Sequence, residues 1–255
     1  MALFCVDIGN TNVVMGLYEG EELVTHWRVA TTHQKMADEY GVLILDLFER
    51  ADRDPADLDG VIVASVVPPL TTIFQKLSQR YLHHTPLVVD VETHTKVRIL
   101  LDNPQEVGAD RVVNAVAAYH RYGGPICVVD FGTATTFDAI SADGDYLGGA
   151  IAPGIGIAAE ALFQRTSKLP RTDLIRPPAA IGRNTIHAMQ SGLIFGYVGL
   201  VEGMVARFRD ELGDGMHVIG TGGLAETMAR ETDVIQVVDP WLTLKGLRIV
   251  WELNQ

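Results

Sequence analysis

A short phrase occurs twice in this chain, near the start and again halfway along. The first copy is Val6-Asp7-Ile8-Gly9-Asn10-Thr11-Asn12, and the second is Val129-Asp130-Phe131-Gly132-Thr133-Ala134-Thr135-Thr136. In each copy an Asp ends a run of strand-forming residues, a Gly follows two positions later, and hydroxyl residues precede a second apolar stretch. This pattern predicts a strand, a tight turn and a returning strand. Because the hairpin is duplicated, the chain is expected to consist of two similar halves.

Both predicted turns have the chemistry of a phosphate site. Glycine lets the backbone approach a ligand, while amide N–H groups and hydroxyls donate to phosphate oxygens and the carboxylate can hold a cation. We therefore predict a nucleotide clamp, in which Asp7 holds hydrated Mg²⁺ and Gly9 to Asn12 contact the phosphates of ATP. For one copy alone, a polar turn that satisfies only its own backbone is an equally good interpretation. The second copy weighs against it, and the absence of G-x-x-x-x-G-K-[ST] disfavours a P-loop enzyme.

The overall composition favours a folded protein with small-molecule partners. The 255 residues are 47% hydrophobic and 20% charged, and the net charge of −12 opposes binding to nucleic acid or to an anionic membrane. Cys5 and Cys127 lie in apolar strand patterns and are expected to act as small hydrophobic residues. No signal peptide or stretch long enough to span a bilayer is recognised, so a cytoplasmic protein is predicted.

The hydrophobic pattern predicts the same plan in both halves, a three-stranded meander followed by alternating helices and strands, which is typical of α/β domains. No flexible linker separates the halves, and we expect domains over 1–116 and 117–255. The first half is expected to have strands at 2–6, 13–18, 22–30, 60–65 and 86–89 and helices at 37–51 and 70–82. The second is expected to have strands at 126–129, 135–140, 146–151, 216–220 and 234–238 and helices at 110–122, 155–163, 184–212, 224–230 and 241–253.

Three further motifs contain residues suited to a binding site. Gly108-Ala109-Asp110-Arg111 opens a predicted helix, where spacing alone fits an ordinary helix-terminal charge as well as a site. Gly154 to Ala159 and Gly220 to Ala225 both match a loose G-x-G-x-x-A. The first segment is better explained as a tight turn into a helix than as a dinucleotide-binding loop. The second suits a backbone that passes close beside adenine or ribose.

Taken together and in order, these motifs resemble type III pantothenate kinases, the first enzymes of coenzyme A synthesis in many bacteria. The resemblance covers nearly the whole chain. It is carried by Asp7-Ile-Gly-Asn-Thr-Asn, Pro104-Gln-Glu-Val-Gly-Ala-Asp-Arg111, Asp130-Phe-Gly-Thr-Ala-Thr, Gly148-Gly-Ala-Ile-Ala-Pro-Gly154, Gly182-Arg-Asn-Thr185 and Gly220-Thr-Gly-Gly223. It implies a duplicated, actin-like (ribonuclease H-like) two-domain α/β fold with a nucleotide cleft between the halves, working as a homodimer.

The resemblance also implies roles for individual residues. The ATP phosphate loop would be formed by Asp7, Ile8, Gly9, Asn10, Thr11, Asn12, Val13 and Val14, with Thr133 as a further ATP contact. Asp130 would bind the monovalent cation, K⁺ or NH₄⁺, that the family requires. Pantothenate would be bound by Gly108, Ala109, Asp110, Arg111 and Thr185, with Asp110 as general base. These roles agree with the chemistry, since Asp110 can accept a hydroxyl proton and Arg111 can pair with a carboxylate.

One position departs from the family pattern, and it leaves alternatives open. Leu101 stands where the family usually has a Tyr before Asn-Pro. A kinase of another small hydroxy acid is therefore a second hypothesis, and a non-catalytic regulatory relative is a third, opposed by the intact Asp7, Asp110 and Asp130. The helix after Thr185 carries more apolar surface than a monomer needs, including Leu193 and Leu200, and is expected to pair with a second subunit.

Overall fold

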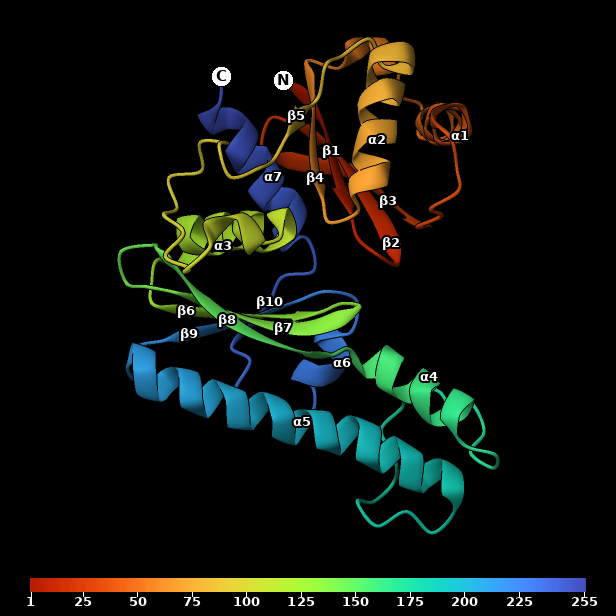
Figure 1. The fold of residues 1–255 in the computed structure, drawn as a ribbon, viewed down its shortest axis with the longest axis vertical. Helices are drawn as coiled ribbons and strands as arrows, with labels where there is room; N and C mark the ends of the chain where they lie inside the picture. The colour runs from red at the N-terminus through yellow and green to blue at the C-terminus, as the bar shows by residue number, and fades with distance from the viewer. The chain divides into compact units, whose positions relative to one another are not determined.

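The computed structural model describes residues 1–255 and forms two compact units (Figure 1). Unit 1 comprises Met1–Arg98, Asp102–Ala117 and Leu242–Gln255, and unit 2 comprises Ile99–Leu101 and Ala118–Trp241. Each unit is built on one five-stranded sheet.

The sheet of unit 1 has the strand order β3-β2-β1-β4-β5, in which β1 pairs antiparallel with β2 and parallel with β4. Its strands are β1 (Ala2–Ile8), β2 (Asn12–Glu19), β3 (Glu22–Ala30), β4 (Gly60–Ser65) and β5 (Leu87–Val88). Its helices are α1 (Ala37–Arg50), α2 (Pro68–Tyr81), α7 (Leu242–Leu253) and the short η1 (Pro55–Asp57) and η2 (Pro104–Glu106). The helix α3 (Ala109–Tyr122) begins in unit 1 and ends in unit 2.

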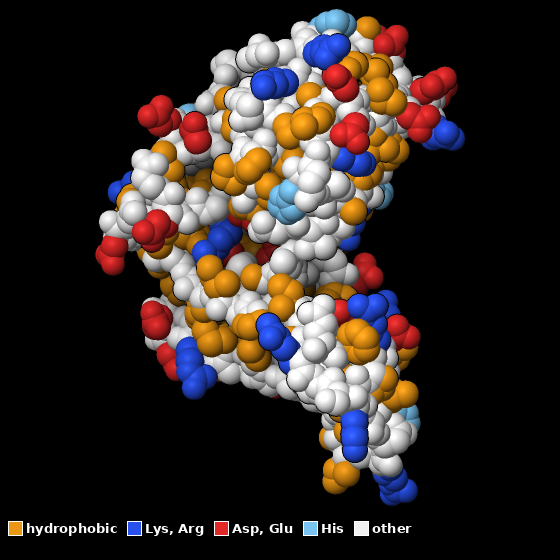
Figure 2. All heavy atoms as spheres, turned by 45° about the vertical axis from the view of Figure 1, so that its right-hand side comes forward, with side chains coloured by type: hydrophobic (Ala, Val, Ile, Leu, Met, Phe, Trp, Pro, Cys, Tyr) orange, Lys and Arg blue, Asp and Glu red, His pale blue; other side chains and the backbone are white.

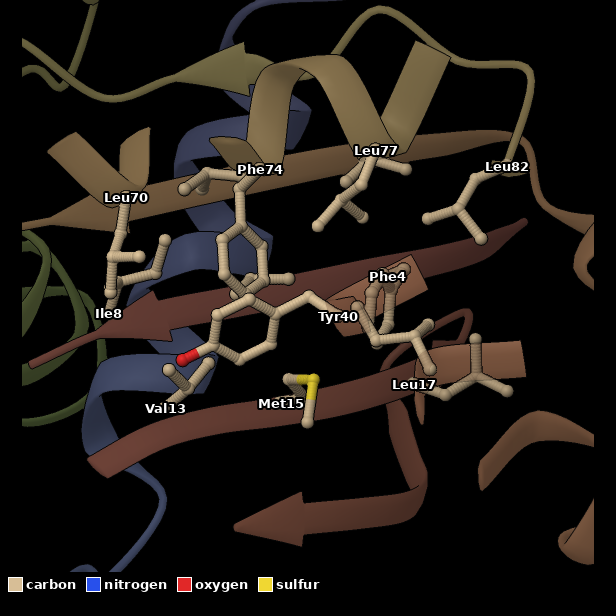
Figure 3. Close-up of a cluster of buried hydrophobic side chains, with 14 of the residues drawn as sticks. Phe4, Ile8, Val13, Met15, Leu17, Tyr40, Leu70, Phe74, Leu77 and Leu82 are labelled. Carbon is tan, nitrogen blue, oxygen red and sulfur yellow. The ribbon is translucent and has the colours of Figure 1, made fainter. Parts of the chain in front are cut away.

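The main core of unit 1 lies between the sheet and the helices α1 and α2. Alternate residues of β1, namely Phe4, Val6 and Ile8, are buried there because successive strand side chains point to opposite faces. Tyr40 of α1 and Phe74 of α2 meet above them with ring centroids 5.0 Å apart (Figure 3). This aromatic contact joins the two helices over the strands that carry the first phrase.

The opposite face of this sheet is covered by α7, the last helix of the chain. A Cβ on Gly16 of β2 would lie 2.7 Å from Leu244, and one on Gly60 of β4 would lie 2.1 Å from Trp251. Glycine at these positions therefore lets α7 pack directly on the strands. Since this burial ties 242–255 to the first sheet, the structure divides the chain differently from the expected domains 1–116 and 117–255, although the first boundary falls between Ala117 and Ala118.

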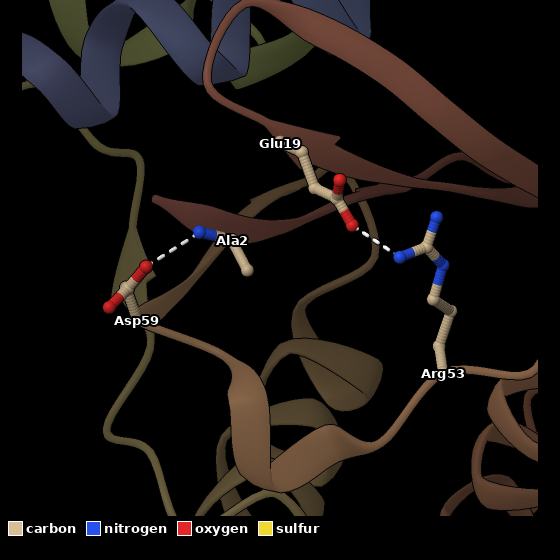
Figure 4. Close-up of polar contacts among 4 residues, drawn as sticks. All are labelled: Ala2, Glu19, Arg53 and Asp59. Carbon is tan, nitrogen blue, oxygen red and sulfur yellow. Dashed lines mark hydrogen bonds and ion pairs between the residues drawn. The ribbon is translucent and has the colours of Figure 1, made fainter.

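Polar contacts hold the start of β1 to its surroundings (Figure 4). The N–H of Ala2 donates to Asp59 at 2.6 Å, just before β4, and Arg53 pairs with Glu19 at the end of β2. Both contacts are exposed, so they set the alignment of the strand ends and contribute little stability.

Unit 2 repeats the same topology, with sheet order β8-β7-β6-β9-β10. Its strands are β6 (Ile126–Phe131), β7 (Ala134–Ile140), β8 (Tyr146–Pro153), β9 (His217–Thr221) and β10 (Val237–Val238). Its helices are α4 (Ile155–Arg165), α5 (Thr185–Leu212) and α6 (Ala225–Ala229). In both units an antiparallel meander is followed by two parallel strands. The predicted duplicated α/β fold is confirmed.

Two expected strands are shorter than their apolar patterns, and of the segment expected at 86–89 only Leu87 and Val88 form β5. Residues 234–238 were expected to form a strand, but only Val237 and Val238 pair with β9. The N–H of Val234 instead donates to the hydroxyl of Thr232, 3.4 Å away, which keeps the start of the segment out of the ladder.

The long helix α5 packs along unit 2. By length and composition it is apolar enough to cross a membrane. Its buried side chains, however, belong to the unit's own core, where Leu193, Ile194 and Val201 meet Val129 of β6 and Val218 of β9. The apolar character of α5 is therefore explained in part by core packing. Leu193, expected on a surface facing a second subunit, is only 4% exposed, and that placement was wrong.

Both cysteines are free and buried, Cys5 in β1 and Cys127 in β6. Burial raises the pKa of the Cys127 thiol to about 12, so the thiol stays protonated at neutral pH. The prediction that they serve as small hydrophobic residues agrees with this.

Candidate functional site

The first hairpin lies at the carboxyl end of β1, where the strand turns back into β2. The N–H of Gly9 donates to the carbonyl of Asn12 at 3.0 Å and closes the turn. A Cβ on Gly9 would lie 3.2 Å from that carbonyl oxygen, so a larger residue would strain the turn. Asp7 precedes the turn and pairs with Val14 across the ladder.

The residues of this hairpin divide into core and surface groups. Ile8 and Val13 are fully buried beneath α1 and α2, so only their backbone can reach a ligand. Asn10 and Thr11 are exposed at the tip, and Asp7 and Asn12 are half-buried. Of the eight residues predicted to bind ATP phosphates, the structure therefore offers the backbone of the turn and four polar side chains.

The motif predicted to bind the acceptor, Gly108–Arg111 (called the acceptor motif below), lies at the start of α3, also within unit 1. Asp110 accepts a hydrogen bond from the backbone N–H of Arg111 at 2.8 Å, which fixes its carboxylate against the first turn of the helix. A Cβ on Gly108 would lie 2.4 Å from Oδ1 of Asp110 and 3.3 Å from the side chain of Val66. Only glycine therefore leaves enough space at position 108. Ala109, the next residue, begins α3.

Val66 connects the acceptor motif to the hairpin. It follows β4 directly, its N–H donates to the carbonyl of Ile8 at 3.1 Å, and its side chain is next to Gly108. Because β1 and β4 are parallel, with Ile8 beside Ser65, their carboxyl ends meet at one edge of the sheet. The structure therefore brings the predicted phosphate turn and the predicted base together within unit 1.

The Asp110 carboxyl has an unusual environment. Burial raises its pKa above the ordinary value, and the N–H and positive charge of Arg111 oppose that rise without cancelling it. A carboxylate that is partly desolvated binds a proton more readily, so it is a stronger base than an exposed Asp.

The second hairpin occupies the equivalent position in unit 2. Asp130 lies near the end of β6, opposite Thr136 of β7 and beside Thr221 of β9. The N–H of Gly132 donates to the carbonyl of Ala134 at 3.0 Å, and Gly132 and Thr133 are exposed at the tip. Thr133 is thus accessible, as its predicted ATP contact requires.

Two other glycine segments close around this second hairpin. The N–H of Gly154 donates to the carbonyl of Thr133 at 3.1 Å just before α4 begins. Gly222 has a φ of +89°, and a Cβ there would lie 2.4 Å from Oδ1 of Asp130. The two G-x-G-x-x-A segments therefore serve as tight turns packed on the hairpin, the first as predicted from sequence.

Thr185 is exposed at the start of α5, where Asn184 caps the helix by accepting from the N–H of His187 at 2.8 Å. The contacts that gather around Asp130 do not include Thr185. Its predicted role in substrate binding stays a prediction.

Comparison with known proteins identifies the family. Residues 3–207 match the type III pantothenate kinase family. A type III pantothenate kinase from Roseiflexus sp. (strain RS-1) is 54% identical over 253 residues, covering 99% of both chains. One from Myxococcus xanthus (strain DK1622) is 53% identical over 252 residues, covering 99% of this chain and 98% of the other.

This chain belongs to the type III pantothenate kinase family. It is accordingly a kinase, and the resemblance drawn from its motifs is confirmed.

Solved structures agree with the fold at lower identity. A Campylobacter jejuni protein described as a Baf family transcriptional activator has a TM-score of 0.65 at 20% identity, covering 98% of both chains. A polyphosphate/ATP-glucomannokinase from Arthrobacter sp. strain KM has a TM-score of 0.54 at 14% identity, covering 100% of this chain and 99% of the other. At such identities these likenesses show the fold alone. They support the predicted actin-like kinase architecture.

Leu101, where this chain departs from the usual family pattern, lies on unit 2. The N–H of its neighbour Leu100 donates to the carbonyl of Tyr146 at 2.8 Å, and a Cβ on Gly148 would lie 3.2 Å from the Leu101 side chain. Tyr146 is itself fully buried and donates its hydroxyl to Asp138 at 2.7 Å. Leu101 therefore lies in a bend that Leu100 ties to β8, with its side chain packed beside Gly148 of that strand.

Sequence reasoning missed two residues that shape the unit 1 site. Val66 and Thr31 were not singled out from the sequence, because each only follows an expected strand, at 60–65 and 22–30. Thr31 donates its hydroxyl to the carbonyl of Gly9 at 2.7 Å. Neither position carries a charge or a motif, so only the three-dimensional arrangement reveals them.

No group of three or more His, Cys, Asp or Glu side chains is placed to hold a metal ion. Asp7 and Asp130 are single carboxylates beside exposed turns. Such a donor set fits a cation that takes most of its ligands from phosphate oxygens and water, as Mg²⁺ usually does.

We predict that Gly222→Ala disturbs the Asp130 carboxylate, because the new methyl group would overlap Oδ1. The variant should lose about 10-fold or more in turnover, since small displacements of positioning groups have effects of this size. Gly213→Ala is the matched control, because Gly213 has a similar φ of +92° but no atom within 4 Å of the added Cβ. It should lose about 1 kcal/mol of stability from backbone strain and keep its activity. Equal turnover in the two variants would contradict the contact with Asp130.

Proposed function

We propose that this chain transfers the terminal phosphoryl group of ATP to the primary hydroxyl of pantothenate, with Asp110 as the general base. The observation that carries the proposal is the full-length match to type III pantothenate kinases at 50–54% identity. The product would be 4′-phosphopantothenate, the first intermediate on the way to coenzyme A.

The geometry of unit 1 supports the assignment of Asp110. Its carboxylate is held by the Arg111 N–H, and Val66 links its motif to the edge of the sheet where the phosphate turn lies. The base would accept the hydroxyl proton as the oxygen attacks phosphorus, and no covalent intermediate on the protein is needed. Arg111 would hold the pantothenate carboxylate, with Gly108, Ala109 and Thr185 completing the contacts.

The phosphates of ATP would be bound by the turn from Asp7 to Val14, with Thr133 as a further contact. The exposed tip of each hairpin and the crowded glycines behind it support this assignment. Asp7 would hold Mg²⁺ through water, and Asp130 would hold K⁺ or NH₄⁺. These cations would reduce repulsion among the phosphate oxygens.

The charge distribution agrees with small-molecule partners. Acidic and basic side chains alternate over the face in Figure 2, without a continuous basic patch. We propose that the protein binds neither nucleic acid nor membrane and works in the cytoplasm, which suits its two free, buried thiols.

We further propose a homodimer formed through the surface around α4. Exposed apolar side chains gather on α4, on the loop that follows it and on the first turn of α5, which lie together at one end of unit 2 (Figure 1). Among them are Ile157 at 50%, Ile181 at 84% and Ile186 at 46% exposure. Further along α5, Gly192, Gly196 and Gly199 have open space beside them. An exposed apolar surface of this kind is typical of an interface.

Asp110→Asn is predicted to reduce turnover about 10²- to 10⁴-fold without unfolding the protein, because it keeps the size and removes the base. The assay is ATP-dependent phosphorylation of pantothenate, run beside a panel of other small hydroxy acids. Asp57→Asn, an exposed carboxylate in η1, is the control and should keep full turnover. Near-normal turnover of Asp110→Asn would contradict the base, and a preferred acid other than pantothenate would contradict the substrate.

Because the pKa of Asp110 is raised, the difference in thermal stability between Asp110→Asn and the wild type should depend on pH. A carboxyl whose pKa is higher in the folded than in the unfolded state stabilises the fold at low pH and loses that contribution as pH rises through the folded pKa. Ionisation of Asp110 above its folded pKa therefore destabilises the wild type, whereas Asp110→Asn cannot ionise and should melt at an equal or higher temperature at the upper end of the pH range. The difference should shrink as pH falls toward the ordinary Asp range, which thermal unfolding from pH 8 to pH 4.5 would measure. A variant that melts lower than the wild type at pH 8 would contradict the burial effect.

The cation proposal predicts that turnover depends on K⁺ or NH₄⁺ and falls in Na⁺ alone. Asp130→Asn should raise the cation concentration needed for half-maximal rate, because it removes the negative charge that attracts the ion. Asp143→Asn, in an exposed turn of unit 2, should leave that concentration unchanged. Equal wild-type rates in all three salts would refute the role of Asp130.

Ile157→Glu is predicted to produce monomers with little activity, because it places a charge within the proposed interface. Val42→Glu is the matched control, since Val42 is an exposed apolar residue, 63% accessible, on α1 of unit 1. Light scattering beside the kinase assay would compare them. A folded Ile157→Glu monomer with full turnover would show that the site does not require the dimer.

A further inference from the structure

Thr31, the residue that follows β3, holds the first hairpin at two points. Its hydroxyl donates to the carbonyl of Gly9 at 2.7 Å, and its backbone N–H donates to the carbonyl of Thr11 at 2.9 Å. These two carbonyls flank the exposed tip at Asn10. One residue outside the repeated phrase thus fixes both sides of the turn.

Fixing these carbonyls also fixes the donors of the turn. A trans peptide unit carries its C=O and the next N–H on opposite sides of one plane, and the peptides here are trans. With the carbonyls of Gly9 and Thr11 directed to Thr31, the N–H groups of Asn10 and Asn12 must point away from it. Thr31 therefore sets the direction of two backbone donors in the turn.

Thr31 is itself held by the core. The N–H of the next residue, Thr32, donates to the hydroxyl of Tyr40 at 3.0 Å. Tyr40 is 1% exposed and packs against Phe74 under α2, as Figure 3 shows. The hairpin is thereby linked through Thr31 and Tyr40 to the helices that cover the sheet.

We propose that Thr31 is a positioning residue for nucleotide binding, which orients the backbone donors of the first turn toward the phosphates of ATP. This inference rests on the proposed assignment of residues 7–14 to those phosphates. It predicts an effect on ATP that is separate from the binding of the acceptor, because the hydrogen bonds of Thr31 go to Gly9 and Thr11 of the hairpin and none goes to the Gly108–Arg111 motif.

The test replaces the Thr31 hydroxyl while preserving the branched shape of the side chain. Thr31→Val should raise the KM for ATP and the Kd for Mg·ATP by roughly 3- to 10-fold, the scale of one hydrogen bond, with the KM for pantothenate unchanged. Thr31→Ser keeps the hydroxyl and should restore both values. Thr25→Val is the control, because Thr25 lies within β3, the strand that ends just before Thr31, and its hydroxyl makes no hydrogen bond in the structure. If Thr31→Val yields no folded protein, Thr31→Ala is compared with Thr31→Ser in its place.

The outcomes separate this inference from the assignment beneath it, with Asn10→Ala as a further arm. Weaker ATP binding in Asn10→Ala and Thr31→Val, with Thr31→Ser and Thr25→Val near wild type, supports the proposal. Weaker binding in Asn10→Ala with no change in Thr31→Val overturns the role of Thr31 alone. Wild-type binding in both overturns the assignment of the hairpin and the inference with it. Equal effects of Thr31→Val and Thr25→Val on ATP binding would show that the Thr31 hydroxyl has no specific role and would overturn the proposal.

Discussion

The parallel pairing of β1 with β4 is the constraint on which the unit 1 site depends. It places the ends of both strands at the same edge of the sheet, with Ile8 beside Ser65. One strand continues into the turn proposed to bind phosphates, and the other continues into Val66, whose N–H donates to the carbonyl of Ile8 and whose side chain lies next to Gly108. A one-residue change in this register would turn Ile8 out of the core and separate the acceptor motif from the turn.

The period of two along a strand explains why the repeated phrase mixes core and polar residues. Val6 and Ile8 face the helices α1 and α2, so Asp7 must point to the opposite face. In unit 2, Val129 and Phe131 face α5 in the same way, and Asp130 points to the other side. Each apolar neighbour anchors the strand and so fixes the carboxylate between them. The duplicated phrase is therefore explained by the packing of its apolar residues as much as by the ligand chemistry of its polar ones.

Much of this arrangement follows from the sequence. The Asp-x-Gly hairpins, the alternation after them and the helix boundaries at Asn184 and Leu212 all come from local patterns that the structure keeps. Spacing alone could not distinguish the Gly108–Arg111 motif from an ordinary helix start. Its predicted role in substrate binding came from the family resemblance. Local patterns could not show that α7 returns to the first sheet, since that depends on glycines at positions 16 and 60, far away in the chain. For the same reason Leu193 was placed on the wrong surface, because an apolar helix face does not reveal which neighbour covers it.

The glycines near the site show how closely the backbone is packed where function is proposed. A Cβ would meet an atom within 3.2 Å at Gly9, 2.4 Å at Gly108 and 2.4 Å at Gly222, and the last two of these atoms belong to Asp110 and Asp130. In the latter two cases the missing side chain leaves room for a carboxylate held against the backbone. Such a carboxylate loses contact with water, and at Asp110 the consequence is a raised pKa. Burial that weakens the folded state once Asp110 is ionised is thus the same feature that makes Asp110 a stronger base.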